Sequence, residues 1–384
     1  MNNDQRLIYA AAFLRAIGIG LLGVLFAINL SAFGFDAPRI GLLVAIGLSG
    51  AVCGTFFVSF WADRFGHRNT LLLLSSCTAA GALGLAAYRS FPWLAASCFL
   101  GMVNGMGRER GALFTLEQRI LPQTAVTQDR TKALAWYNVL LDLGQAAGSL
   151  LAFAARQSAF ALYAALSCGS FFLYLRLSRK VESGSVEAGK PISPASRKII
   201  TRLSLLFGFD SLAGGFLPGS LIAFWFFKRF GLGEHLLGPL FFLAHLANAV
   251  SYLVAARLAK KIGLVRTMVF THLPANLCLI AIPFVPSAAI AAILYLVRES
   301  LVEMDVPTRQ SYVLAVVEPH ERTVAAGITN LVRLAAWTVA PTLAGLAMGS
   351  LALGSPLVVG GSMKALYDGL LYRSFRNVKP PEEK

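Results

Sequence analysis

Long apolar stretches, separated by short polar turns, run through almost the whole chain. A helix needs roughly 20 apolar residues to cross the hydrocarbon core of a bilayer, and it satisfies its backbone polar groups without water. We therefore predict twelve spanning helices, referred to below as spans one to twelve. Their approximate ranges are 7–33, 38–61, 69–88, 93–119, 131–155, 158–177, 199–227, 236–259, 264–284, 287–314, 323–348 and 352–373.

One polar segment, residues 178–198, is longer than the other turns and lies near the middle of the chain. It is rich in Ser, Gly and Pro, a composition typical of a flexible linker. We therefore predict a six-helix bundle over 1–177 and a cytoplasmic linker over 178–198. A second six-helix bundle with a short cytoplasmic tail is predicted over 199–384.

The polar turn between spans two and three recurs in weaker form between spans eight and nine. The aligned residues are Asp63, Arg64 and Gly66 in the first copy and Lys260, Lys261 and Gly263 in the second. A second match aligns 129–138 with 321–330, each with an acid–base pair, then Thr and one Asn. Two matches at similar spacing predict two similar halves related by an axis along the membrane normal.

The first of these turns resembles the signature loop between helices two and three of the major facilitator superfamily, roughly Gly-x-x-x-Asp-Arg-x-Gly-Arg-Arg. Asp63, Arg64 and Gly66 match that motif, whereas Ser59 replaces its first Gly and His67 replaces an Arg. The resemblance implies an all-α membrane protein of two six-helix bundles related by pseudo-twofold symmetry. It also implies a secondary transporter that works by alternating access.

The resemblance further implies a gate. In the superfamily the Asp and Arg of this loop form a latch that closes the cytoplasmic side, a role that falls here to Asp63 and Arg64. Near the cytoplasmic end of span ten, Asp305 and Arg309 bracket a proline, which should bend the helix there. The alternative interpretation of the first turn is a basic anchor that only sets topology. The complete predicted gating set is Asp63, Arg64, Gly66, Arg68, Asp305 and Arg309.

Composition agrees with a membrane protein. The 384 residues are 56% hydrophobic and 14% charged, with a mean hydropathy of +0.65. Soluble domains are about 45–50% apolar and about 25% charged. Twelve spans use most of this length, so we expect no separate soluble domain.

The formal net charge of +15 raises the question of nucleic acid. Most loop Lys and Arg residues fall in loops that would share one side of the membrane, as the positive-inside rule expects. We therefore predict a multi-pass protein of the plasma membrane, or of the inner membrane in a bacterium, with both termini cytoplasmic. The lipid bilayer is an expected partner, and nucleic acid is not, because no basic patch is interleaved with aromatic residues.

Ionisable residues inside spans are the candidate functional residues. Each costs at least about 2.5–3.5 kcal/mol at the centre of a bilayer, so each needs a physical reason. The substrate or proton candidates are Arg15, Arg108, Glu109, Asp142, Asp210, Arg298, Glu299, Glu303 and Arg333. The alternative for each is a permanent salt bridge that only aligns helices.

Depth along the spans suggests how these charges pair. Asp142 in span five lies near the depth of Arg108, and Arg333 in span eleven lies near that of Glu299 and Glu303, so we predict one interhelical ion pair per half. Glu299 and Glu303 are four residues apart and share one helical face. Two acids on one face in low dielectric resist being charged together, which suits a site that binds and releases protons.

Two features concern bending and direction of transport. Glycines and Pro218 surround Asp210, so we predict that span seven is broken near Asp210. Span five carries 144–149, which is similar to the antiporter motif of drug exporters, with Ser149 where that motif has Pro. The alternative, purely structural interpretation of Gly144 and Gly148 is that they allow close helix packing.

We therefore predict proton-coupled efflux of a small organic or amphipathic solute by a monomeric transporter. A proton- or anion-coupled carrier of an anionic metabolite is the alternative, because Arg residues suit such a substrate. A receptor or scaffold that no longer transports is the alternative from another class. We expect no enzyme, cofactor or metal site, because the histidines are scattered singly and no phosphate-binding GxxxxGK[ST] loop occurs.

Overall fold

The computed structural model describes residues 3–109, 111–124, 130–179, 193–317 and 321–376. Within these ranges every regular element is a helix, which confirms the predicted all-α class. Most of the predicted linker, and residue 129 of the repeated segment, lie outside the described residues. Seven described helices are long and apolar enough to cross a membrane, judged by length and composition.

The helices of the first half follow the predicted spans one to six, with span four in two pieces. They are α1 (Asn3–Ala32), α2 (Ala37–Phe65), α3 (His67–Ala87), α4 (Phe91–Leu100), α5 (Ala112–Thr124), α6 (Arg130–Leu151) and α7 (Ala159–Leu175).

The second half follows spans seven to twelve, with spans seven and ten in two pieces. Its helices are α8 (Pro194–Gly215), α9 (Gly219–Phe230), α10 (Glu234–Ile262), α11 (Leu264–Ala281), the short 3₁₀ helix η3 (Ile282–Phe284), α12 (Ala288–Val302), α13 (Asp305–Ala315), α14 (Arg322–Ser350) and α15 (Ser355–Phe375).

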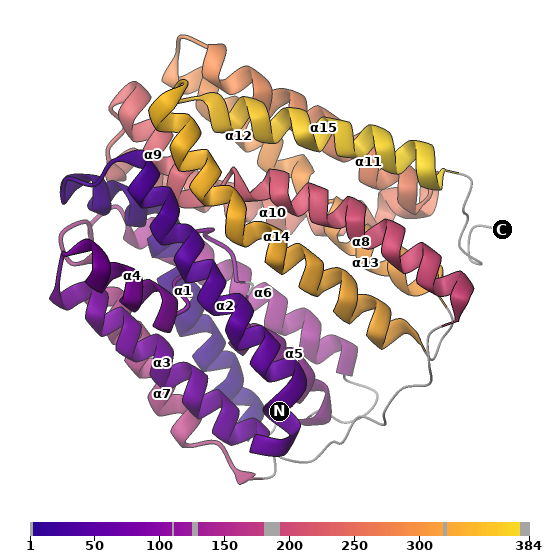
Figure 1. The fold of residues 1–384 in the computed structure, drawn as a ribbon, viewed down its shortest axis with the longest axis horizontal. Helices are drawn as coiled ribbons and strands as arrows, with labels where there is room; N and C mark the ends of the chain where they lie inside the picture. Colours follow the sequence, from indigo (N-terminus) through magenta and orange to yellow (C-terminus); the bar gives the residue numbers. More distant parts are fainter. Residues whose placement is uncertain (1–2, 110, 125–129, 180–192, 318–320, 377–384) are drawn as a thin grey trace. The chain divides into compact units, whose positions relative to one another are not determined.

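Contacts between residues divide the chain into two compact units. Unit 1 consists of Met1–Val186 and Pro218–Phe242, and unit 2 of Glu187–Leu217 and Leu243–Lys384. In unit 1, α1 packs against α6, α7 and α9, and α3 packs against α7; in unit 2, α8 packs against α14 and α15, and α11 against α15 (Figure 1). The boundaries predicted from composition, 1–177 and 199–384, stay a prediction.

The two repeated turns share one backbone geometry. Gly66 ends α2 with φ of 90°, and Gly263 ends α10 with φ of 87°. A residue with a Cβ rarely adopts a backbone conformation with such a positive φ. The amide of Gly66 donates to the carbonyl of Ala62, and the amide of Gly263 to that of Ala259, both at 2.9 Å. The aligned glycines therefore make equivalent sharp turns in the two halves.

Three predicted spans are interrupted. Span seven breaks at 216–218, not near Asp210, which lies inside α8. The reason is Pro218, which cannot donate a backbone hydrogen bond and stands immediately before α9. Span four is interrupted at 101–111, and span ten at Glu303 and Met304.

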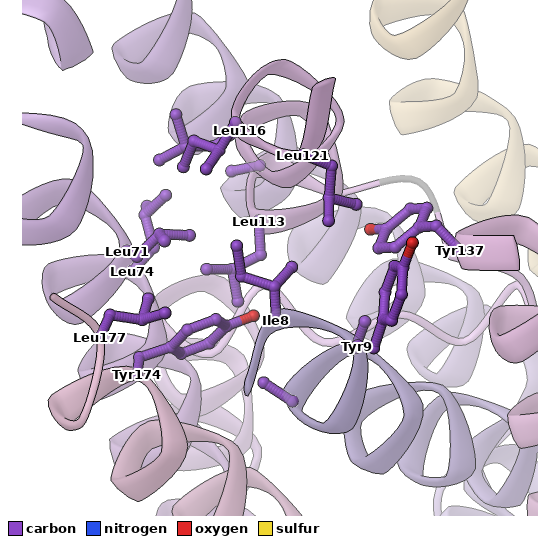
Figure 2. Close-up of a cluster of buried hydrophobic side chains, with 14 of the residues drawn as sticks. Ile8, Tyr9, Leu71, Leu74, Leu113, Leu116, Leu121, Tyr137, Tyr174 and Leu177 are labelled. Atoms are coloured by element: carbon purple, nitrogen blue, oxygen red, sulfur yellow. The ribbon is translucent and has the colours of Figure 1, made fainter. Parts of the chain in front are cut away.

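Each unit has its own hydrophobic core. The core of unit 1 gathers buried side chains from α1, α2, α3, α5, α6 and α7. Figure 2 shows it, with Tyr137 and Tyr174 on opposite sides and both hydroxyls directed inward. The core of unit 2 joins α8, α11, α13, α14 and α15. Both cores lie beside the charged clusters described next.

Candidate functional site

The interior of unit 1 contains two carboxylates that share one guanidinium. Arg15 of α1 donates from Nε to Glu109 Oε2 at 2.8 Å and from a terminal nitrogen to Glu117 Oε2 of α5. All three side chains are buried, and that of Glu117 is 0% exposed. Two acids and one cation leave one formal negative charge when both acids are ionised.

Glu117 is held by further donors. The hydroxyl of Tyr137, from α6, donates to Glu117 Oε2 at 2.8 Å, and the hydroxyl of Tyr174, from α7, donates to Oε1 at 2.6 Å. These are the inward hydroxyls of Figure 2. Arg15 also donates to the Tyr174 oxygen at 2.7 Å. Glu117 is therefore anchored from three neighbouring helices.

Glu109 lies in the interruption of span four rather than on a helix. Its Oε1 accepts from the amide of Gly111 at 3.3 Å. The Asn104 side chain accepts from the amide of Met106 at 2.8 Å, which folds the loop back on itself. With its amide assigned to satisfy both groups, Gln145 of α6 donates to the Gly107 carbonyl at 3.3 Å and accepts from the Glu109 amide at 3.2 Å.

The same loop also binds the start of α9. The amides of Gly219 and Ser220 donate to the carbonyls of Met106 and Gly105, each at 3.1 Å. Irregular backbone at membrane depth is tolerated only where protein or a cavity satisfies it. Several backbone groups in the interruption of span four are therefore satisfied by hydrogen bonds within unit 1.

A small cavity of about 30 Å³ opens beside Glu109, which is enough room for a water molecule. Its polar lining comes from Arg15, Asn104, Glu109, Thr78 and Tyr163. Glu117 is not among its lining residues. Of the two acids, Glu109 is thus the one that borders this cavity.

A second buried charged cluster lies inside unit 2. Lys364 Nζ of α15 is 2.6 Å from Asp210 Oδ1 of α8. Arg309 of α13 is 2.5 Å from Asp305 Oδ2 and 3.6 Å from Asp210 Oδ2. Asp305 and Arg309, predicted as part of a gate, are therefore buried within this cluster.

Two more groups complete the unit 2 cluster. His272 Nδ1 of α11 is 2.8 Å from Asp368 Oδ1 of α15, and Asn276 donates to Asp368 Oδ2 at 2.9 Å. Arg333 of α14 donates from Nε to the Ser211 hydroxyl at 3.1 Å, and its guanidinium lies 5.1 Å from the Trp337 ring centroid. In the described part of the chain, no group of three His, Cys, Asp or Glu residues could hold a metal ion.

Two acids of span ten, Glu299 and Glu303, accept hydrogen bonds from side chains of α10. Asn248 donates to Glu299 Oε2 at 2.9 Å, and Tyr252 donates to Glu303 Oε2 at 3.0 Å. Arg298 forms an ion pair with the neighbouring Glu299. Because Asn248 and Tyr252 are also four residues apart, the two contacts repeat at the helical spacing.

The predicted interhelical ion pairs fare differently. Asp142, half-buried on α6, interacts electrostatically with Arg108, and an ion pair between the two stays a prediction. Arg333, in contrast, has Ser211 and Trp337 as its described partners rather than an acid of α12. The depth of a residue along a span does not show which way its side chain points around the helix axis. That direction decides which residue of a neighbouring helix it contacts.

The predicted gating turn is tied within unit 1. Asp63, 48% exposed, is 2.7 Å from a terminal nitrogen of Arg119 on α5 and 3.0 Å from His67 Nε2. Arg68 donates to the carbonyls of Leu177 and Leu175 at the end of α7, at 2.8 and 2.9 Å. Arg64 is exposed. The turn thus joins α2 and α3 to α5 and α7.

Sequence reasoning missed several residues that these clusters contain: Glu117, Tyr137, Tyr174, His272, Lys364 and Asp368. Four of them had a signal. Glu117, His272, Lys364 and Asp368 are ionisable residues within apolar spans, which the rule applied to the others would also have selected. The two tyrosines had none, because only the tertiary fold brings them to Glu117.

Known proteins resemble this chain over nearly its full length. The profile of the Major Facilitator Superfamily matches residues 8–341. An uncharacterized membrane protein of Saccharomyces cerevisiae is 22% identical, covering 98% of this chain and 95% of that protein. The human organic anion transporter MFSD10 superposes with a TM-score of 0.67 and 17% identity, covering 96% of this chain and 99% of that one. A D-xylose-proton symporter superposes with a TM-score of 0.75 and 14% identity, covering 97% of both chains.

Proposed function

The chain belongs to the major facilitator superfamily and is a secondary transporter rather than an enzyme, and from this premise we propose that it couples a small organic solute to protons. In such folds two repeats rock about a central site and expose it to each side of the membrane in turn. Coupling requires a buried group whose protonation changes during that cycle. We propose that unit 1 contains a group of this kind.

The observation that supports coupling is the surplus charge around Arg15. Arg15 faces both Glu109 and Glu117, so within this group of three described residues one negative charge is left unbalanced when both acids are ionised. An unbalanced charge in a buried site is costly, and binding one proton removes it. Glu117 accepts hydrogen bonds from three donors, whereas Glu109 lines the cavity. We therefore assign the exchangeable proton to Glu109.

Export is the direction that we propose, from the similarity of 144–149 to the exporter motif. A carrier of an anionic solute is the second candidate, and the observation that favours it is Arg333, whose described partners are a hydroxyl and an aromatic ring. We propose further that the transporter works as a monomer with both termini cytoplasmic. The turn with Asp63 and Arg64 remains our proposal for the cytoplasmic gate.

The test is proton and solute flux in liposomes that contain the purified full-length protein. Cationic, neutral and anionic organic solutes are supplied one at a time under an imposed proton gradient. For the wild type we expect solute flux accompanied by proton flux, and the relative sign separates exchange from cotransport. We expect Glu109→Gln to uncouple the two, because the amide cannot bind and release the proton.

Two comparison variants make the assignment specific. Asp36→Asn removes an exposed acid that caps α2, and Asn preserves the cap, so coupling should persist. Glu299→Gln/Glu303→Gln removes the acids of span ten, which Asn248 and Tyr252 hold in place, and coupling should also persist. Loss of coupling in the double variant, with coupling kept in Glu109→Gln, would move the proton site to α12. Solute flux without any proton movement in the wild type would contradict coupling itself.

A further inference from the structure

The unit 2 cluster behaves as one system of charges. Its acids are Asp210, Asp305 and Asp368, its cations are Lys364, Arg309 and Arg333, and His272 can add a further positive charge. Asp210 interacts electrostatically with Lys364, His272, Arg309 and Arg333. With His272 neutral the formal charges cancel. Any proton or ion that enters the cluster therefore changes its net charge.

Most charges in this cluster already have a partner. Lys364 lies against Asp210, and Arg309 lies between Asp305 and Asp210. Two charges are left over from these ion pairs. One belongs to Asp368 and the other to Arg333.

The remaining acid, Asp368, is held by neutral groups unless His272 is protonated. One oxygen faces His272 Nδ1 at 2.8 Å, and the other accepts from the Asn276 amide at 2.9 Å. His272 and Asp368 are 2% and 1% exposed. A proton taken up by this pair turns it into an ion pair of imidazolium and carboxylate, or into neutral His with carboxylic acid. In both forms the charge of Asp368 is cancelled.

The remaining cation, Arg333, is half-buried and offers donors without an acid. Among the residues that the structure describes, no carboxylate lies within ion-pair distance of it, in contrast to Lys364 and Arg309. The buried hydroxyl of Tyr367 interacts electrostatically with Arg333 and also with Arg309, from which it accepts a side-chain hydrogen bond. A guanidinium that forms no ion pair with a described carboxylate is suited to an anionic oxygen acceptor.

We propose that unit 2 binds one organic anion at Arg333 together with one proton at the His272–Asp368 pair. The proposal rests on the proposed transport function and specifies its substrate as an organic carboxylate. Protonation of the pair leaves the cluster with one positive charge, and the anion cancels it. Because each ligand removes the charge that the other creates, each raises the affinity for the other, and this coupling is reciprocal.

Co-binding has a consequence for transport. The proton and the anion occupy unit 2 at the same time, so they cross the membrane in the same direction. Their combined gradients set that direction, and export of an accumulated organic acid is one case. The proton at the His272–Asp368 pair is additional to the one assigned to Glu109, and its movement together with the anion is cotransport rather than exchange.

The test measures binding rather than flux. Acetate, benzoate and succinate are titrated into the full-length protein in detergent micelles by calorimetry, each against its amide as a neutral control. Between about pH 6 and pH 8 these acids are ionised. We expect at least one carboxylate to bind more tightly than its amide. Its affinity should rise as pH falls, by up to about tenfold per pH unit, the limit for one proton taken up per anion.

Three variants assign the residues. Arg333→Gln should abolish the preference for carboxylate over amide. Asp368→Asn, which resembles the protonated acid, should bind the carboxylate without dependence on pH. Arg202→Gln removes an exposed charge of α8 and should behave as the wild type. If Asp368→Asn does not fold, uptake of protons by the wild type on adding the carboxylate, followed with a pH dye in weak buffer, tests the same point.

The results of these measurements separate the carboxylate site from the transport proposal. The proposal is overturned if no carboxylate binds better than its amide, if Arg333→Gln keeps the preference, or if carboxylate binding takes up no proton. Carboxylate binding as expected, without coupled flux in liposomes, would reject the transport proposal and leave this site in place. Coupled flux of a cation or neutral solute, without carboxylate binding, would reject this carboxylate site and leave the transport proposal in place.

Discussion

Glu109 and Glu117 share one guanidinium, yet their surroundings differ. Glu117 accepts hydrogen bonds from Arg15, Tyr137 and Tyr174 and has no exposed surface. Glu109 is bound by Arg15 and one backbone amide and borders a cavity. The first acid should hold helices together, and the second should change state during transport.

This difference predicts unequal costs of substitution. Glu117→Ala removes the acceptor of the Tyr137 and Tyr174 hydroxyls and one of the two acids of Arg15, so the free energy of unfolding should fall by about 3–5 kcal/mol. Glu109→Gln leaves Glu117 as the ion-pair partner of Arg15, so it should lower the free energy of unfolding clearly less than Glu117→Ala. Denaturant-induced unfolding in detergent micelles measures both values. Equal losses for the two variants would show that Glu117 is not the anchor.

At the scale of helices, glycines decide how closely α1 and α6 approach. A Cβ on Gly148 of α6 would lie 1.9 Å from the Ile17 carbonyl oxygen, and one on Gly20 of α1 would lie 2.0 Å from the Gln145 carbonyl oxygen. Backbone atoms cannot move aside as a flexible side chain can. This contact bears out the packing interpretation of Gly148 and leaves the exporter motif a proposal.

We predict that Gly148→Ala destabilises the protein, because it forces the two helices apart. Overpacking a close contact costs roughly 1–3 kcal/mol. Gly327→Ala is the matched control: this exposed glycine of α14 has no atom within 4 Å of a Cβ, and glycine inside a helix costs roughly 0.5–1 kcal/mol relative to Ala. Thermal unfolding in detergent should show a lower midpoint for Gly148→Ala and an unchanged or higher one for Gly327→Ala. The opposite order would contradict this account of the α1–α6 contact.

At the scale of the whole molecule, the compact units do not follow the order of the chain. Pro218–Phe242 belongs to unit 1, although it follows the first segment of unit 2 in sequence. Its link to the rest of unit 1 includes the amides of Gly219 and Ser220, which satisfy two carbonyls in the interruption of span four. Unit 1 is therefore incomplete without a segment from the second half of the chain.

A chain divided within 180–192 tests this organisation. The fragment that ends there lacks Pro218–Phe242, so we expect it to aggregate or to unfold at a lower temperature when expressed alone. Co-expression with the remaining fragment should restore a monodisperse complex on size-exclusion chromatography. If the first fragment alone is as stable as the complex, unit 1 does not need α9.

The sequence alone determined the class of the protein, the family and the two repeated turns. These properties are local: a run of apolar residues predicts a span wherever it lies, and Gly66 or Gly263 predicts a sharp turn without knowledge of the rest. It also selected most of the buried charges, such as Arg15 and Glu109, because a charge within a span is unusual in any context.

Only the tertiary structure decided which charges meet. Arg15 reaches Glu117 from another helix, and Asp368 meets His272, because helix rotation and packing bring them together, and neither follows from hydropathy. The interruption of span four was hidden as well: 101–108 is composed mostly of Gly, Met and Val up to Arg108, so it continues the apolar run while its glycines allow the backbone to leave the helix. Partners and breaks depend on neighbours distant in sequence, and for that reason the folded chain alone specifies them.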